Sequence, residues 1–191
     1  LTESVHGYLW DSESYKNTAV VDHRRLAIEG ELGVKLLSAD SDDVSKWEVE
    51  YEPIIEIHMA GMDGPKEDDL GRRGLELIGT NCIHAGVVHS TNTKRCLIGE
   101  ISLNEMMTVS VGNEKIEQVT LSELRVGEML GPVATLSWLL KTLKSEGNKE
   151  EALLREGAFV ICSTPGALHL VPPGSKVRVE FSDLETSCTA T

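Results

Sequence analysis

The sequence predicts an α+β protein that is mainly β. Short runs of β-branched or alternating apolar residues recur along its 191 residues, whereas helical periodicity is confined to a few segments. Strands in series with a few interposed helices differ from the regular alternation of strand and helix in parallel-sheet proteins. Because no linker or repeat divides the chain, we expect one domain over residues 1–191.

The predicted strands share β-branched or alternating residues bounded by turn residues. Only eight aromatic residues are present (Phe 2, Trp 3, Tyr 3), so the core must be built mainly from Val, Ile and Leu. In chain order the strands lie within VHGYLW, TAVVD, ELGVKLLS, PIIEIHM, HAGVVHS, RCLIGEISL, MTVSVG, KIEQVTL, AFVICST and KVRVEF.

One segment, residues 131–147, has the periodicity of an amphipathic helix. Pro132 suits its first turn and Gly147 its end. Weaker helices are predicted from Lys66 to Leu75 and from Asp43 towards Tyr51. The apolar positions of the first segment follow a 3-4-3 spacing: Val133, Leu136, Leu140 and Leu143.

The composition excludes some partners. Asp+Glu at 31 against Lys+Arg at 18 gives a net charge of -13, which repels a phosphate backbone, so we expect no nucleic-acid partner. No apolar run approaches the roughly 18 residues that cross a bilayer, so we expect no membrane association and a cytoplasmic location. The cysteines lack zinc-type spacing, and reduced thiols are expected at Cys82, Cys96, Cys162 and Cys188.

Two glutamates stand out in the apolar run LAIEGELGVKL, residues 26–36. In a strand, Glu29 and Glu31 point to the same face, about 7 Å apart by backbone rise. Like charges with apolar neighbours repel one another and lose hydration, and a hard divalent cation relieves both penalties. The alternative is a strand with one solvated face, on which the two carboxylates have no special role.

A third carboxylate favours the cation. Glu56 lies in PIIEIHM, where the flanking isoleucines predict a buried strand that does not tolerate an unpaired charge. Glu29, Glu31 and Glu56 would together form a carboxylate site for Mg²⁺ or Mn²⁺ with coordination positions open to a chelating substrate.

A second hypothesis concerns acid or base catalysis by histidine. His58, His84 and His89 lie in or beside apolar runs, where a histidine satisfied within the core is the common outcome. For acid or base catalysis, His84 and His58 are the candidates. The sequence contains no HExxH, GxSxG or Walker pattern.

Six motifs in order along the chain resemble the 2-keto-4-pentenoate hydratase group, which includes 4-oxalocrotonate decarboxylase and belongs to the fumarylacetoacetate hydrolase superfamily. VHGYLW resembles the first strand of that family, IEGEL its Glu-x-Glu metal motif and PIIEI its Pro-x-x-Glu strand. TNCIHAGVV resembles its Asp-Asn-x-x-x-Ala-Gly segment, and LGPVATLSWLLKTL its Pro-containing helix. AFVICSTPGALHLVPPGSKVRVEF resembles its final hairpin.

The resemblance implies a fumarylacetoacetate-hydrolase-like mixed β-roll with a few flanking helices. It implies a metal-dependent lyase, either a hydratase or a decarboxylase, in which a 2-oxo or enolised acid binds the cation as a chelating ligand. It also implies a homo-oligomer, or a hetero-complex with a paralogue. Substrate oxygens would be bound by Asn81, Ser163 and Thr164.

The sequence departs from the family in ways that keep alternatives open. The Asp-Ser-Arg that usually follows the third glutamate is replaced by residues 57–61, IHMAG. The family's N-terminal segment, which supplies a lysine often assigned to catalysis, is expected upstream of Leu1. The alternatives are a scaffold repurposed for cyclisation or isomerisation of a keto-enol metabolite, and a non-catalytic partner of an active paralogue.

Overall fold

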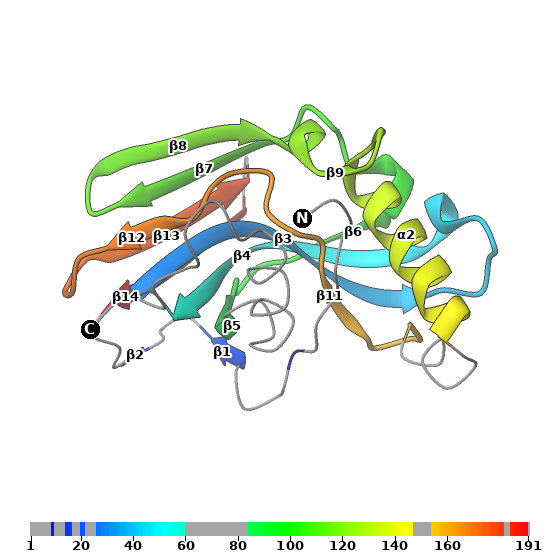
Figure 1. Cartoon of the computed structure of the whole chain (residues 1–191), viewed down its shortest axis with the longest axis horizontal. Coiled ribbons are helices and arrows are strands. Elements are labelled where there is room, and N and C mark those ends of the chain that lie inside the picture. Colours follow the sequence, from blue (N-terminus) through cyan, green and yellow to red (C-terminus); the bar gives the residue numbers. More distant parts are fainter. Residues whose placement is uncertain are drawn as a thin grey trace, which may run out of the picture.

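The chain folds into two main β-sheets, a two-stranded ribbon and one α-helix within the residues described by its computed structural model (Figure 1). The described residues are 9, 14–16, 20–21, 26–59, 84–146, 154–181 and 184–190. The predicted α+β, mainly β class is therefore confirmed. The strand predicted in VHGYLW and the helix predicted from Lys66 to Leu75 lie outside the described residues.

The first sheet is built on two long antiparallel strands. Its members are β1 (Ser14–Lys16), β3 (Leu26–Ser38), β4 (Glu48–Met59), β5 (His84–His89), β6 (Lys94–Leu97), β11 (Phe159–Ile161) and β12 (His169–Val171). The strand order is β1-β5-β4-β3-β11, with β6 beside β4 and β12 beside β3. Only β1 runs parallel to its neighbour, β5, so the sheet is mixed.

The second sheet lies against one face of the first (Figure 1). Its members are β2 (Val20–Val21), β7 (Met106–Val111), β8 (Glu114–Thr120), β13 (Lys176–Phe181) and β14 (Leu184–Ala190), in the order β2-β14-β13-β7-β8. The separate ribbon pairs β9 (Arg125–Val126) with β10 (Met129–Leu130). Strand β14 was not predicted from the sequence, because its residues, LETSCTA, are mostly polar and lack a clear alternation.

The alternation of β3 fixes which of its side chains enter the core between the sheets. The apolar residues of one face are fully buried: Ile28, Leu32, Val34 and Leu36. Gly30 is on the same face and lies where β7 comes closest. A Cβ on Gly30 would stand 2.8 Å from Val109 Cγ2 and 3.1 Å from Met107 Cε. The two glutamates of β3 consequently occupy the opposite face.

The predicted helix at residues 131–147 is confirmed as α2 (Gly131–Glu146). Leu136 and Leu143 of its apolar stripe are buried. The helix packs at one end of the sheets against three short 3₁₀ turns, η2 (Val44–Lys46), η4 (Ile98–Glu100) and η5 (Leu121–Glu123) (Figure 1). No helix among the described residues is long and apolar enough to cross a membrane.

The helix predicted from Asp43 towards Tyr51 is wrong. The side chain of Asp43 accepts a hydrogen bond from the Ser45 backbone N–H, 3.2 Å away, but this cap starts only the single turn η2. The chain is extended again from Glu48, because Val49 and Tyr51 alternate into the core as part of β4. The period of two along β4 outweighs the local capping signal.

The described cysteines differ in burial, which predicts an order of reactivity. Burial raises the pKa of the Cys188 thiol to about 11, and burial together with the charge of Glu31 raises the pKa of Cys162. Cys96 is only partly buried, although burial and Glu100 also raise its pKa.

At pH 8 we expect iodoacetamide to modify Cys96 at least about tenfold faster than Cys162 or Cys188, because the thiolate is the reactive form and must be accessible. Peptide mass mapping over time measures the three rates, and the denatured protein gives the control in which they converge. Equal native rates for Cys96 and Cys162 would contradict the described burial.

Candidate metal centre

The register of the two long strands brings two predicted metal ligands face to face. In the β3–β4 ladder, Glu29 pairs directly with Glu56, Glu31 pairs with Ile54, and Ala27 pairs with His58. Directly opposed residues in an antiparallel ladder project to the same face, with Cβ atoms about 4.5–5.5 Å apart. The carboxylates of Glu29 and Glu56 therefore share one face of the first sheet, opposite the face that packs on β7.

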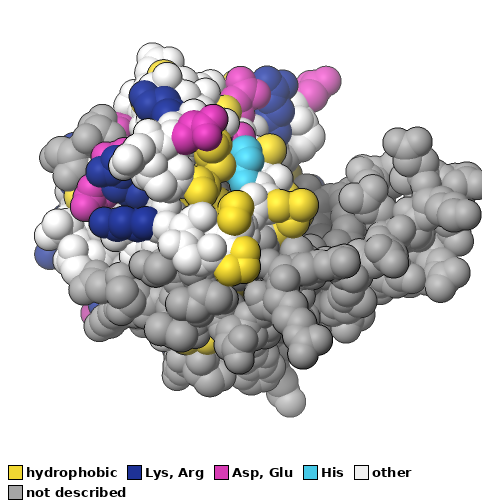
Figure 2. Space-filling view, turned by 90° about the vertical axis from the view of Figure 1, so that its left-hand side faces the viewer, with side chains coloured by type: hydrophobic (Ala, Val, Ile, Leu, Met, Phe, Trp, Pro, Cys, Tyr) yellow, Lys and Arg dark blue, Asp and Glu magenta, His cyan; other side chains and the backbone are white. Residues whose placement is uncertain are grey.

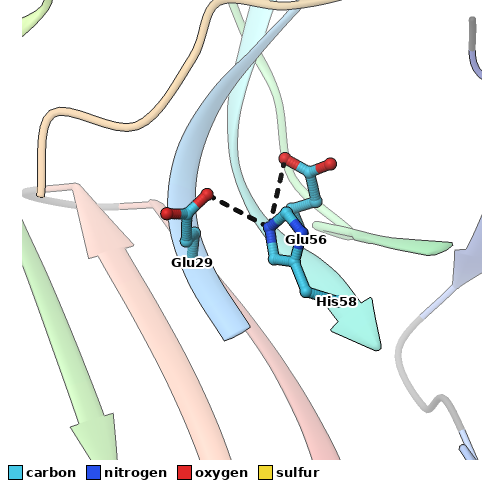
Figure 3. Close-up of side chains that lie close together, drawn as sticks. All are labelled: Glu29, Glu56 and His58. Atoms are coloured by element: carbon cyan, nitrogen blue, oxygen red, sulfur yellow. Dashed lines mark hydrogen bonds and ion pairs between the residues drawn. The ribbon is translucent and has the colours of Figure 1, made fainter. Parts of the chain in front are cut away.

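The side chain of His58 reaches between these two carboxylates (Figure 3). Its Nε2 lies 3.1 Å from Glu29 Oε2, to which it donates a hydrogen bond, and 3.7 Å from Glu56 Oε2. The imidazole is nearly buried, at 6% exposure, and the Glu29 and Glu56 side chains are 19% and 12% exposed. One ligand atom from each residue lies within 4.8 Å of the others, which is the spacing of a metal-binding group.

Glu56 contacts two histidines, His58 and His84. Burial alone would raise its pKa, but the hydrogen bond with His84, the charge of His58 and a hydrogen bond with Glu31 together hold the pKa of Glu56 below its usual value. His84 Nδ1 approaches Glu56 Oε1 to 2.6 Å. Glu56 is thus kept as an anion in a site that is mostly withdrawn from water.

Glu31, the third predicted carboxylate, is 3% exposed and lies deeper than the other two. A hydrogen bond between two carboxyl groups needs one proton, and the bond between Glu31 and Glu56 lowers the pKa of Glu56. The group of close ligand atoms comprises Glu29, Glu56 and His58, and Glu31 adjoins it through Glu56.

The loop after β11 is attached to the backbone between the two β3 glutamates. Thr164 Oγ1 donates a hydrogen bond to the Gly30 carbonyl at 3.0 Å and accepts one from the Gly166 backbone N–H at 3.0 Å. Ser163 is exposed and has a φ of 76°, a left-handed backbone. Substrate contacts of Ser163 and Thr164 stay predictions, and the predicted contact of Asn81 lies outside the described residues.

Solved structures share this architecture, although no family model and no curated protein matches the sequence. 4-Oxalocrotonate decarboxylase from Pseudomonas putida G7, complexed with magnesium and adipate, superposes with a TM-score of 0.74. The two are 16% identical over 97% of this chain and 69% of that chain. The chain has the fumarylacetoacetate hydrolase fold. The resemblance read from six short motifs is therefore confirmed at the level of the fold.

Two further proteins show how varied the reactions of this fold are. Fumarylpyruvate hydrolase from Pseudomonas aeruginosa, in complex with Mn²⁺ and pyruvate, has a TM-score of 0.59 and 14% identity over 93% of this chain and 73% of that chain. 5-Carboxymethyl-2-hydroxymuconate delta-isomerase from Mycobacterium smegmatis has a TM-score of 0.57 and 9% identity over 94% of this chain and 65% of that chain. The fumarylacetoacetate hydrolase fold alone therefore does not fix the reaction.

The residues on this fumarylacetoacetate hydrolase fold suit a divalent cation. Glu29 and Glu56 offer carboxylate oxygens, His58 offers a ring nitrogen, and all three atoms converge on one region. Carboxylates bind Mg²⁺ and Mn²⁺, and imidazole is a common ligand of first-row transition metals. The Nδ1 contact of His84 with Glu56 resembles the outer contacts that orient metal ligands in proteins.

A second polar group on the same face was not predicted from the sequence. Glu52, four residues before Glu56, accepts from His89 Nδ1 at 2.8 Å and from the Ser90 backbone N–H at 2.7 Å. Ser14 Oγ lies 2.7 Å from His89 Nε2. The period of two places Glu52 on the face of Glu56, but its pairing with a histidine 37 positions away could not be deduced without the β4–β5 register.

A third polar contact lies in the β8–β12 region, where His169 pairs with Ile28 and therefore lies on the face of β3 opposite Glu29. Glu117 accepts a hydrogen bond from the Ala167 backbone N–H at 2.9 Å, and its Oε2 is 3.2 Å from His169 Nε2. Leu168 and Leu170 flank His169 in sequence, and Leu170 is 76% exposed. Figure 2 shows a face on which hydrophobic side chains gather around a histidine among charged groups.

Proposed function

We propose that this protein is a divalent-metal-dependent enzyme acting on a 2-oxo acid or its enol, as a lyase of the hydratase or decarboxylase type. The observation that carries the proposal is the pairing of Glu29 with Glu56 across two central strands, with His58 between the carboxylates. The substrate class is supported by the neighbour that binds Mn²⁺ together with pyruvate, a 2-oxo acid.

The acidic residues would hold the cation, Mg²⁺ or Mn²⁺. When bound, such a cation supplies Lewis acidity towards the carboxylate and 2-oxo oxygens of a chelating substrate and stabilises enolate charge. Glu29 and Glu56 provide carboxylate ligands from opposed positions, and Glu31 is the third predicted carboxylate. The low exposure of the site limits competition from water and strengthens charge interactions within it.

The proton transfers of hydration or decarboxylation would need a nearby acid or base, and His84 is the candidate. Its Nδ1 lies 2.6 Å from Glu56 Oε1, which places the imidazole beside a proposed metal ligand. A carboxylate on one ring nitrogen fixes the ring orientation. Ser163 and Thr164, on the loop attached to Gly30, are the proposed groups for binding substrate oxygen.

A second candidate is isomerisation or cyclisation of a larger keto-enol compound. Two observations favour it. The family that this sequence resembles usually continues from the third glutamate into Asp-Ser-Arg, whereas this chain has His58 in the segment after Glu56. A second imidazole, that of His84, also contacts Glu56. An isomerase moves a proton between carbons without needing water or releasing CO₂. Product analysis with 2-oxo dienoates and with bulkier 1,3-dicarbonyls separates the two candidates.

A thermal-shift measurement combined with a turnover assay tests the proposed function. After removal of metal by chelation, Mn²⁺ at about 100 times its Kd should add about 2.7 kcal/mol of stability. For a chain of this length that corresponds to a rise in Tm of roughly 5–10 °C. Loss of 2-oxo dienoate absorbance should then depend on the added ion.

Exposed Glu114 at the start of β8 offers a matched control, because Glu114→Gln removes one carboxylate outside the group of close ligand atoms and should leave both readouts unchanged. A wild-type protein whose Tm responds to neither Mg²⁺ nor Mn²⁺, and which turns over no 2-oxo acid, would overturn the proposed function. Homo-oligomer formation, also expected from the resemblance, remains a prediction that light scattering can check in the same samples.

A further inference from the structure

The position of His58 bears on which ion the site selects, an inference that rests on the proposed function. His58 is two residues after Glu56 on β4, so the two side chains share one face, and His58 pairs with Ala27 of β3. The His58 side chain contacts Glu29, the residue two positions after Ala27 on β3. As a result Nε2 is directed at the Glu29 and Glu56 carboxylates (Figure 3).

The spacing of the three donor atoms is compatible with one ion. Ligand atoms bound to a single cation at about 2.1 Å lie about 3 Å apart when adjacent and about 4.2 Å apart when opposite. Here Nε2 of His58 lies 3.1 Å from Glu29 Oε2 and 3.7 Å from Glu56 Oε2. In the proposed complex, contacts with a shared ion replace these direct contacts.

The chemistry of the donor set then discriminates between ions. Mg²⁺ is a hard cation that takes oxygen ligands and releases water reluctantly. Imidazole suits first-row transition metals, whose affinity for such ligands rises from Mn²⁺ to Cu²⁺ and falls again at Zn²⁺. A site with two carboxylates and one imidazole therefore favours a transition metal more strongly than a site of carboxylates alone.

We propose that His58 binds the metal through Nε2 together with Glu29 and Glu56, and that this nitrogen ligand makes the site selective for Mn²⁺ and later first-row ions over Mg²⁺. His84 and Glu31 hold Glu56 from the outside, which keeps its carboxylate in place when the ion binds. His58 is thereby a metal ligand and not the acid or base of the reaction.

The first test measures selectivity in a variant. Calorimetry gives the Kd of Mn²⁺ and of Mg²⁺ for wild type, His58→Gln and the control His169→Gln, whose ring pairs with Glu117 in the β8–β12 region. We expect His58→Gln to weaken Mn²⁺ binding by about tenfold or more while changing Mg²⁺ binding less, so that the ratio of the two constants falls. The control should keep the wild-type ratio.

The second test needs no variant and so does not depend on the folding of His58→Gln. Pulsed electron paramagnetic resonance of Mn²⁺ bound to wild type should show modulation from a directly bound nitrogen, and labelling the histidines with ¹⁵N should change that modulation. Tightly bound Mn²⁺ without a nitrogen signal, and with an unchanged ratio in His58→Gln, would overturn the role of His58 while leaving the metal-dependent enzyme intact. Absence of Mn²⁺ binding to wild type would overturn both.

Discussion

Replacing Glu56 by Gln is expected to weaken Mn²⁺ binding by more than about 100-fold and to remove metal-dependent turnover. Gln keeps the size of the side chain but offers a neutral amide oxygen in place of an anionic ligand. The loss is large because Glu56 is mostly buried and is held as an anion by His84, His58 and Glu31, so no water-exposed group can readily replace it. Calorimetry and the shift of Tm on adding Mn²⁺ measure the effect.

Glu52 provides a matched control on the same strand and face. Glu52→Gln also removes a buried carboxylate that contacts a histidine, His89, but its position is four residues from Glu56 and outside the group of converging ligand atoms. We expect it to lower stability while leaving the Kd of Mn²⁺ within about threefold. If the two variants lose Mn²⁺ binding equally, the ion is not bound at Glu56.

Replacing Gly30 by Val is expected to lower stability by about 3 kcal/mol, near the upper end of overpacking costs, and to lower Tm by roughly 6–12 °C. A Cβ at this position would already stand 2.8 Å from Val109 Cγ2, and Val109 is fully buried with a stiff branched side chain. Relief requires the sheets to separate locally, which displaces the backbone between Glu29 and Glu31. Chemical denaturation and a Mn²⁺ titration measure the two consequences.

A compensating substitution tests the cause. Val109→Ala removes the methyl groups that oppose Gly30, so adding it to Gly30→Val should recover part of the lost stability, although Val109→Ala alone is destabilising. A double variant whose loss equals the sum of the single losses would show that the contact between β3 and β7 is not what requires glycine. Recovered stability with persistently weak Mn²⁺ binding would locate the damage at the glutamates.

Sequence reasoning succeeded where a local pattern was sufficient. The 3-4-3 spacing identified α2 almost to its last residue, and the alternation of LAIEGELGVKL put Glu29 and Glu31 on the face away from the core. It failed from Asp43 to Tyr51, where a good cap produced one turn before the alternation of β4 took over. It missed β14 because that strand is mostly polar and is defined by its pairing with β13.

Only part of the candidate site could be predicted from the sequence. Glu29, Glu31 and Glu56 were predicted together as metal ligands, but the directly opposed pairing of Glu29 with Glu56 depends on the β3–β4 register. His58 was predicted as an acid or base because its sequence neighbours gave no sign that Nε2 reaches both carboxylates. Contacts between strands depend on register and sheet curvature, which periodicity within one strand does not specify.

The hydrogen bond of the Thr164 hydroxyl has a consequence for movement of the loop after β11. By bonding to the Gly30 carbonyl, it ties the segment that carries Ser163 to the peptide unit midway between Glu29 and Glu31. A molecule that pushes this segment aside must pull on that peptide unit or break the bond. Displacement of the segment that carries Ser163 and the relative position of the Glu29 and Glu31 carboxylates are thus coupled through the Thr164 hydroxyl.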